Sequence, residues 1–229
     1  MKIIFLNAWQ GQVPSIKQFI IDNISSTDIF CFQESFNFDS EIFCLNYMAD
    51  YQYFFDRKRV SDKDEFINTT FVKKDFSVLE TKTLGQGDTS VGLGIFNKIK
   101  TPNGKIFNLC NFHGHARPGD KQDTLDRIKQ SQKIIDFLKN FSGPKIIGGD
   151  FNLDRDIKST RLFEENGYKS LIKEFNITNT RNEISWRKYP TKQHFADHLF
   201  ITPDIKITNF SVPYNEVSDH LPLVLEFKI

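Results

Sequence analysis

The chain has 229 residues, and its 30 lysines and arginines against 29 aspartates and glutamates leave a formal net charge of +1. A charge this close to zero neither requires nor excludes a polyanionic partner, so any attraction for phosphate must come from local groups or a bound cation. The length suffices for one large domain with a buried core. Because no Ser/Gly-rich, charged or repetitive stretch interrupts it, we expect residues 1–229 to form a single α/β domain.

The first third of the chain has the order strand, helix, strand. Lys2–Leu6 and Asp28–Phe32 are short apolar runs typical of buried strands, and Val13–Ile24 has apolar residues at helical spacing. This order predicts two parallel neighbouring strands joined by a right-handed crossover. Their carboxyl ends then lie side by side and carry Asn7 and Glu34.

The middle of the chain indicates a series of shorter strands separated by glycines, which mark turns or close backbone approaches. These strands are predicted at Tyr51–Phe55, Ile67–Val72, Phe76–Leu84 and Val91–Asn97. A longer apolar run, Lys105–Phe112, predicts another strand that ends at His113.

The second half contains the clearest amphipathic helix, Thr124–Phe141, which Gly143-Pro144 terminates. The strand predicted next, Lys145–Gly149, ends at Asp150. The remaining predicted elements are a helix at Ile157–Asn166 and strands at Leu199–Thr202, Ile205–Val212 and Leu223–Phe227.

The sequence carries no sign of a membrane helix or an export signal. No span approaches the roughly 20 apolar residues of a membrane helix, and Lys2–Leu6 resembles a core strand rather than part of a signal peptide. Cys31, Cys44 and Cys110 lie in apolar runs, which is typical of reduced core thiols. We therefore expect a monomeric cytoplasmic protein with no membrane span.

Polar side chains occur repeatedly where predicted strands meet loops. Four of them follow strands: Asn7, Glu34, His113 and Asp150. Three others precede strands: Asp197, Asp219 and His220. All of them can meet at one edge only if the late strands run antiparallel to the early ones. The sequence therefore predicts mixed sheets, with the site at the carboxyl ends of the first group of strands.

Oxygen ligands without thiolates favour Mg²⁺ or Mn²⁺ over Zn²⁺. Glu34 is the best direct ligand, and Asn7 adds a neutral amide oxygen. Asp150 is placed to accept a proton from an attacking water molecule. Asn152 lies two residues further on in a segment that we predict to be extended, so that both side chains project to the same side and Asn152 fixes the water's orientation.

The histidines complete the predicted site. His220 can donate a hydrogen bond to a phosphate oxygen as negative charge develops, and Asp197 is a candidate to fix its tautomer. His113 is a candidate phosphate contact from the opposite side, and Asp219 can complete the metal site or hold a second ion. Each residue taken singly also fits a turn or a solvated loop. The interpretation therefore depends on their joint arrangement at strand ends.

These motifs resemble those of the endonuclease/exonuclease/phosphatase (DNase I-like) superfamily over residues 7–222. They are Asn7, Gln33-Glu34, His113, Gly149-Asp150-Phe151-Asn152, Asp197 and Ser218-Asp219-His220. The resemblance implies a four-layered α/β sandwich of two packed mixed β-sheets flanked by helices. It also implies Mg²⁺-dependent hydrolysis of a phosphoester by in-line attack of water, with Mn²⁺ as a substitute.

The resemblance also implies a role for each motif residue. Glu34 is similar to the metal ligand, with Asn7 as its partner and Asp219 as a second carboxylate near the metal. Asp150 is similar to the base that orients water, with Asn152 beside it. The remaining roles are the phosphate-binding His220, Asp197 that orients it, and the phosphate contact His113.

Two positions depart from the family pattern. His198 follows Asp197 where family members often carry an aromatic residue, commonly tyrosine. Ala8-Trp9 follows Asn7 in place of the Asn-x-Asp or Asn-x-Asn of repair nucleases, which disfavours an abasic-site endonuclease.

Basic residues and aromatic residues alternate in loops near the predicted site, a composition that suits nucleic-acid phosphates and bases. The candidates for substrate contact are Arg117, Trp186 and Arg187, with Lys121 and Arg181 among the neighbouring basic residues. We therefore expect a nuclease or nucleotide phosphodiesterase acting on nucleic acid or nucleotides. The alternatives are a phosphoesterase for inositol phosphates or sphingomyelin-like lipids and a non-catalytic binding module.

Overall fold

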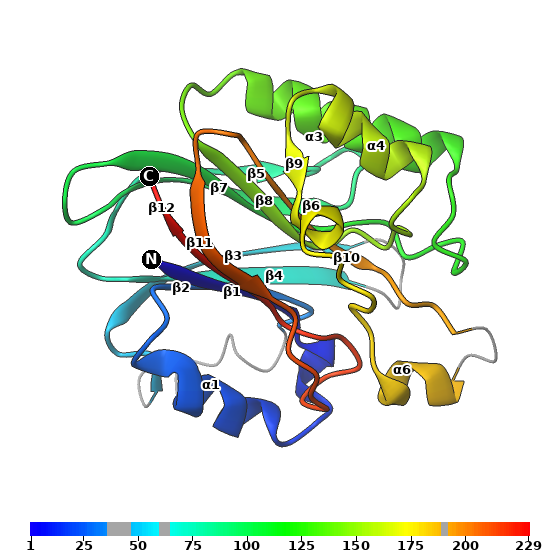
Figure 1. The fold of residues 1–229 in the computed structure, drawn as a ribbon, viewed down its shortest axis with the longest axis horizontal. Coiled ribbons are helices and arrows are strands. Elements are labelled where there is room, and N and C mark those ends of the chain that lie inside the picture. The colour runs from blue at the N-terminus through cyan, green and yellow to red at the C-terminus, as the bar shows by residue number, and fades with distance from the viewer. Residues whose placement is uncertain (36–46, 60–64, 189–191) are drawn as a thin grey trace.

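The computed structural model describes residues 1–35, 47–59, 65–188 and 192–229. Two six-stranded sheets pack face to face, and helices cover their outer faces (Figure 1). This arrangement confirms the predicted sandwich of two mixed sheets flanked by helices. Within the described residues, no helix is long and apolar enough to cross a membrane.

The first sheet has the strand order β11-β12-β1-β2-β4-β3. Its strands are β1 (Lys2–Asn7), β2 (Ile29–Gln33), β3 (Tyr51–Arg59), β4 (Glu65–Lys73), β11 (Lys206–Ser211) and β12 (Leu223–Lys228). β1 and β2 run parallel, with Ile3 opposite Ile29, and α1 (Ile16–Ile24) lies between them in the chain. The predicted strand-helix-strand unit is therefore confirmed, although its helix begins three residues later than expected.

The second sheet has the strand order β5-β6-β7-β8-β10-β9. Its strands are β5 (Ser77–Leu84), β6 (Leu93–Lys100), β7 (Ile106–His113), β8 (Lys145–Asp150), β9 (Lys169–Ser170) and β10 (Asp197–Ile201). β7 and β8 are parallel, whereas β10 runs antiparallel to β8. The predicted reversal of the late strands is thus present, and it brings the start of β10 to the carboxyl end of β8.

One predicted strand boundary is wrong in a way that matters for the site. The expected strand began at Leu199 with Asp197 in the loop before it, but β10 begins at Asp197 itself. The reason is register: Asp197 lies opposite Asp150 in the antiparallel pair, so backbone pairing extends to the end of β8. Both carboxylates are therefore held by a sheet rather than by a loop.

The central strands are apolar on both faces because both faces are covered. In β1, Ile3 and Phe5 belong to the cluster between the sheets, whereas Ile4 and Leu6 belong to the cluster that includes Ile16 of α1. The alternation follows from the two-residue repeat of a strand. Cys31 and Cys110 are buried free thiols, as expected, and Cys44 lies outside the described residues.

Helices on the second sheet complete the outer layer. Figure 1 shows α3 (Leu125–Lys139) and α4 (Lys158–Glu165) over this sheet, with α1 on the opposite side of the molecule. The side chain of Thr124 caps α3 by accepting a hydrogen bond from the Arg127 amide. The short helices are η1 (Trp9–Gly11), α5 (Leu171–Glu174) and α6 (Glu183–Lys188).

Two adjacent glycines allow the sheets and strands to approach closely just before Asp150. A β-carbon at Gly148 would lie 2.8 Å from the Phe5 ring of the other sheet. At Gly149, where φ is +133°, a β-carbon would lie 2.1 Å from the carbonyl oxygen of Phe112. Only glycine fits this second position, because both its backbone conformation and the space around it exclude a side chain.

Near the carboxyl ends of β2 and β7, amide side chains replace apolar ones between the sheets. Gln33 Nε2 donates to Asn111 Oδ1 at 2.6 Å. Asn111 Nδ2 in turn lies 3.1 Å from the carbonyl oxygens of both Phe32 and Thr69. These bonds join strands of different sheets, so they fix how the sheets align beneath the site.

We predict that Asn111→Ala lowers the free energy of unfolding by about 2–4 kcal/mol, because it removes a buried acceptor of the Gln33 amide and the side-chain donor to two buried carbonyl oxygens. Urea unfolding followed by circular dichroism measures this change. Asn209→Ala, at an exposed position of β11, is the matched control and should change stability by less than about 0.5 kcal/mol. Equal effects of the two substitutions would contradict a cross-sheet role for Asn111.

Candidate active site

Asp150 lies at the centre of the polar groups that the fold brings together. It is the last residue of β8 and is only 2% exposed. Its Oδ2 accepts a hydrogen bond of 2.9 Å from Nδ2 of Asn7, which ends β1 in the other sheet. Asn7 Nδ2 also lies 3.0 Å from Oε1 of Glu34. One amide therefore holds two carboxylates together across the junction of the sheets.

Glu34 and His113 form the more open side of the site. Glu34 follows β2 with φ at +50°, a left-handed conformation that is strained for a residue with a side chain. Its side chain is one-quarter exposed. His113 Nε2 lies 3.9 Å from Glu34 Oε1 and 3.7 Å from Asp150 Oδ2. The carboxylate of Glu34 thus faces both His113 and Asp150 while remaining accessible from outside.

His220 approaches Asp150 from the opposite direction. Its Nδ1 lies 3.0 and 2.9 Å from the two carboxylate oxygens of Asp197, so it donates to that carboxylate. The other ring nitrogen, Nε2, lies 3.7 Å from Asp150 Oδ2. Because the start of β10 pairs with the end of β8, Asp197 is positioned to hold the imidazole ring against Asp150.

The charges of these buried groups support one another. Burial alone would lower the pKa of His220, but the carboxylates of Asp197 and Asp150 outweigh it and raise this pKa to about 9. Burial likewise opposes ionisation of Asp150, yet His220, His113 and Lys121 hold its pKa well below the usual range. At neutral pH the site therefore contains an ionised Asp150 beside a protonated His220.

Asn152 corrects one prediction. The segment after Asp150 is not extended, because Asn152 has φ at +55° and the chain turns there. Its backbone amide donates to Asp150 Oδ1 at 2.9 Å, and its side chain donates to the carbonyl of Gly114 and accepts from the amine of Lys121. Asn152 therefore fixes the Asp150 carboxylate through its backbone, and its side chain ties the neighbouring loops together.

Asp219 is paired with a residue that sequence analysis placed among the loop cations. Its Oδ2 lies 3.0 Å from a guanidinium nitrogen of Arg181, which is only 5% exposed. Its Oδ1 lies 3.9 Å from His220 Nε2. Arg181 reaches this position because its backbone forms a bridge with His220. The spacing of Arg181 from the motifs gives no sign of this contact, which depends on the path of the chain between strands.

Lys121 is the second buried cation that the sequence does not distinguish from surface lysines. It is 7% exposed, and its amine contacts Asn152 Oδ1. Among the described residues, no carboxylate lies within ion-pair distance of this amine. Burial accordingly lowers the pKa of Lys121. A buried ammonium without a carboxylate partner is costly unless it has a role, such as meeting an anion.

The residues predicted to contact substrate lie on two segments that Gln193 joins. Arg117 and Arg187 are exposed. Trp186 is half-buried, and its indole donates to the carbonyl of Gln193 at 3.0 Å. The side chain of Gln193 also contacts the carbonyl of Gly119, so it joins the Trp186 segment to the loop that carries Arg117.

His198 occupies the position where the family often has an aromatic residue. It is fully buried, its Nε2 lies 2.9 Å from the carbonyl oxygen of Leu153, and its ring stacks on Phe200. Burial lowers its pKa to about 4, so it is neutral at physiological pH. His198 therefore packs here as a buried structural residue.

The donor atoms around Asp150 fit a hard divalent cation. Single ligand atoms from Glu34, His113 and Asp150 lie within 4.8 Å of one another. Two of the three are carboxylate oxygens, which suit Mg²⁺ or Mn²⁺. Asn7, predicted as an oxygen ligand, instead turns its nitrogen to the carboxylates, since its Oδ1 accepts a hydrogen bond of 2.9 Å from the Trp9 amide. Asn7 thus acts here by holding the two carboxylates in place.

The sequence matches the Endonuclease/Exonuclease/phosphatase family over residues 7–220, and the chain belongs to this family. Members of the family hydrolyse phosphoester bonds and typically depend on a divalent metal. The motifs from Asn7 to His220 therefore carry the resemblance that the sequence indicated. No curated protein was found to match the chain.

Solved structures with the same fold include enzymes of different kinds. The human Nocturnin catalytic domain with bound sulfate has a TM-score of 0.79 at 19% identity, covering 100% of this chain and 93% of that one. A mannosyl-6-phosphatase of Bacteroides thetaiotaomicron has a TM-score of 0.73 at 18% identity and covers 100% of both chains. D. rerio TDP2 complexed with a single-strand DNA product has a TM-score of 0.71 at 14% identity, covering 100% and 99%. At these identities the similarity establishes the shared fold.

We predict that His220 makes the stability of the metal-free protein depend on pH. Its pKa in the folded state, about 9, exceeds the ordinary value of 6.5. Its stabilising contribution is therefore complete below about pH 6.5 and is lost as the pH rises through about 9. Urea unfolding in chelator should show His220→Gln less stable than the wild type by an amount that shrinks between pH 6 and pH 10. His194→Gln, at an exposed position, should show no such trend, and a constant gap for His220→Gln would contradict the charge pairing.

Proposed function

We propose that this protein is a divalent-cation-dependent phosphoesterase, with Mg²⁺ as its cation and Mn²⁺ as a substitute. The observation that carries the proposal is the convergence on Asp150 of Glu34, His113 and His220 from three other strand ends. Two imidazoles and two carboxylates arranged around one shielded point suit a reaction in which a phosphate group is attacked by water.

Glu34 and Asp150 have different roles in the proposed in-line hydrolysis. Glu34, on the open side of the site, would hold the cation together with Asp150, and a bound cation would stabilise negative charge on the phosphoryl oxygens. Asp150, kept ionised by its neighbours, orients the attacking water and accepts its proton as the new P–O bond forms. The leaving oxygen departs from the opposite side of phosphorus. Asn7 and the backbone of Asn152 prevent Asp150 from rotating away.

The protonated His220 stabilises the transition state. Its Nδ1 is committed to Asp197, so Nε2 is the nitrogen that faces Asp150 and donates to a non-bridging phosphate oxygen. His113, 3.7 Å from the same Asp150 oxygen, contacts the phosphate from the other side. The buried ammonium of Lys121 adds a further positive charge near the phosphate.

One candidate substrate class is nucleic acid or nucleotides, so that the enzyme is a nuclease or nucleotide phosphodiesterase. The amine of Lys192 lies over the Trp186 ring, 5.0 Å from its centre. Arg117, in the loop before α3, and Arg187, in α6, are exposed. An aromatic ring with adjacent cations suits a base and its phosphates. The likeness in fold to TDP2 complexed with a single-strand DNA product is compatible with this class.

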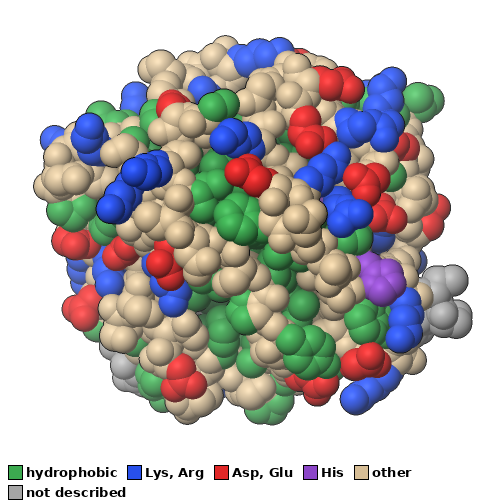
Figure 2. Space-filling view, viewed as in Figure 1, with side chains coloured by type: hydrophobic (Ala, Val, Ile, Leu, Met, Phe, Trp, Pro, Cys, Tyr) green, Lys and Arg blue, Asp and Glu red, His purple; other side chains and the backbone are tan. Residues whose placement is uncertain are grey.

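A second candidate class is a small polar phosphoester. Figure 2 shows basic and acidic side chains interspersed over the visible face, in keeping with the near-zero net charge. Arg155, in the loop between β8 and α4, is paired with Asp156 at 2.9 Å, so this cation is already neutralised by a neighbour. The fold is shared with a mannosyl-6-phosphatase, which is compatible with this class.

We predict that Asp150→Asn lowers kcat by at least about 100-fold, because an amide neither carries the negative charge nor accepts the proton of the attacking water. The assay is hydrolysis of p-nitrophenyl and bis(p-nitrophenyl) phosphate with Mg²⁺, Mn²⁺ or chelator. Asp136→Asn, on the exposed face of α3, is the matched control and should retain full activity. Circular dichroism should show both variants folded, and an Asp150→Asn protein with near-normal turnover would refute the proposed site.

We predict that the two carboxylates named from sequence as metal ligands differ in their effect on Mg²⁺ affinity. Glu34→Gln should weaken Mg²⁺ binding by about 10-fold or more, because it removes a directly placed ligand charge. Asp219→Asn should change it by less than about 3-fold, because Asp219 is neutralised by Arg181. Calorimetric titration of the folded variants measures both affinities. A larger loss of Mg²⁺ affinity in Asp219→Asn than in Glu34→Gln would show that Asp219 is the ligand.

A further inference from the structure

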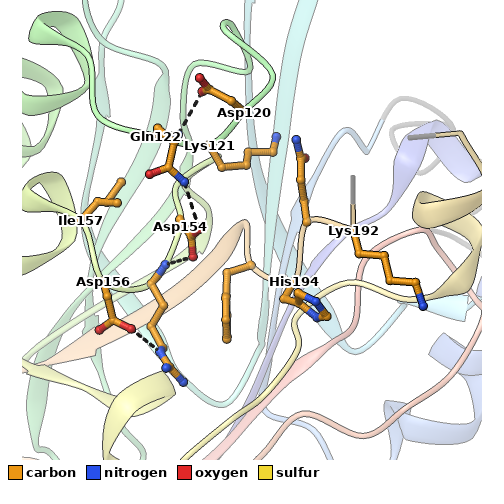
Figure 3. Close-up of a pocket in the computed structure, with 11 residues that line it drawn as sticks. Asp120, Lys121, Gln122, Asp154, Asp156, Ile157, Lys192 and His194 are labelled. Carbon is orange, nitrogen blue, oxygen red and sulfur yellow. Dashed lines mark hydrogen bonds and ion pairs between the residues drawn. The ribbon is translucent and has the colours of Figure 1, made fainter. Parts of the chain in front are cut away.

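A pocket of about 610 Å³ lies between three loops of the second sheet. It is lined by residues 120–122 before α3, residues 154–157 between β8 and α4, and residues 192–195 before β10 (Figure 3). A cavity of this size is typical of sites for small molecules. None of the groups assigned to bond cleavage above, apart from Lys121, lines it.

Lys121 and Gln193 place this pocket beside the active site. Lys121 forms part of the pocket wall, and its amine contacts the side chain of Asn152, whose backbone amide holds Asp150. Gln193 lines the pocket as well, and its Oε1 lies 3.5 Å from the Arg181 guanidinium. A molecule that fills the pocket therefore meets Lys121, which is linked to Asp150 through Asn152.

The charges of the pocket walls balance. Three carboxylates, Asp120, Asp154 and Asp156, face the same space as Lys121, Arg155 and Lys192. Arg155 is paired with Asp156. A strand of nucleic acid that entered the pocket would bring further phosphates against the three carboxylates, which repel them. The pocket therefore favours an occupant that is itself uncharged, with its phosphate left outside beside Lys121.

The polar groups of the pocket suit hydroxyl groups. Gln122 Nε2 donates to Asp154 Oδ2 at 3.1 Å, and the Gln122 backbone amide donates to Asp120 Oδ1 at 3.0 Å. Figure 3 shows this row of amide and carboxylate groups along one wall. Each carboxylate keeps further acceptor positions, and hydroxyl groups can both donate to these and accept from the amide. Phe195 adds an apolar surface, backed by the Arg155 guanidinium at 4.9 Å from its ring centre.

We propose that this pocket binds the uncharged, polyhydroxylated part of a small phosphoester, of the size of a sugar or cyclitol. Its phosphate then lies beside Lys121 and faces Asp150 and His220. The inference rests on the proposed phosphoesterase function and names its substrate class. Gln122 and Asp154 are specificity-determining residues in this arrangement, and Lys121 is the group common to the pocket and the phosphate.

The test compares substrates that share the phosphate and differ in the attached group. Turnover with Mg²⁺ is measured for a hexose monophosphate, an inositol monophosphate, p-nitrophenyl phosphate and a single-stranded oligonucleotide. We expect kcat/KM to be highest for one of the two polyol phosphates, and which one it is separates a sugar from a cyclitol. A preference for the oligonucleotide would overturn the inference and favour a nucleic-acid substrate.

Two substitutions in the pocket make the test specific. Gln122→Ala, at an exposed position, and Asp154→Asn each remove groups that face the polyol. We expect the ratio of kcat/KM for the polyol phosphate to that for p-nitrophenyl phosphate to fall about 10-fold, mainly through a higher KM, as one lost hydrogen bond predicts. Asp136→Asn is the control and should leave the ratio unchanged.

The outcomes separate this inference from the proposed function. If the wild-type protein hydrolyses none of the four substrates, the phosphoesterase proposal itself fails. If p-nitrophenyl phosphate is hydrolysed but the ratio is the same in the wild type and both pocket variants, the phosphoesterase proposal stands and the pocket inference is wrong. Gln122→Ala remains decisive if Asp154→Asn does not fold, because Gln122 contributes little buried surface.

Discussion

The burial of one carboxylate sets the conditions for the whole site. Asp150 is removed from water at the end of β8, so its negative charge must be balanced by groups that the protein itself supplies. Those groups come from both sheets: Asn7 from the first, His113 from the second, and His220 from the segment before β12. The sheets must therefore align closely, and the hydrogen bond between the side-chain amides of Gln33 and Asn111 maintains that alignment.

Much of the fold could be predicted because its strands are apolar runs bounded by polar residues. Strands buried on both faces leave a continuous signal in the sequence, and the parallel unit of β1, α1 and β2 follows from the order of elements. The antiparallel direction of β10 could be deduced from chemistry, since Asp197 reaches Asp150 only in that direction. The pairing of Asp197 with His220 was expected because the imidazole needs a partner that fixes its tautomer.

The parts that could not be predicted are those decided by individual partners in space. No spacing indicates that Arg181 is buried against Asp219, or that Lys121 reaches Asn152. Asparagine readily adopts the left-handed conformation, but the contacts of Asn152 with Gly114 and Lys121 that hold the turn exist only in the folded chain. Likewise, the orientation of the Asn7 amide depends on the Trp9 backbone, which only the folded chain brings into contact.

The separate origins of the pocket and the catalytic groups have an evolutionary consequence. The walls of the pocket belong to three surface loops, whereas the groups around Asp150 stand at the ends of strands. Mutations in the loops can therefore change which substrate is preferred, while the groups that carry out the reaction stay the same. Lys121 belongs to both the pocket and the catalytic groups, so substitution there is constrained by substrate binding and by the reaction.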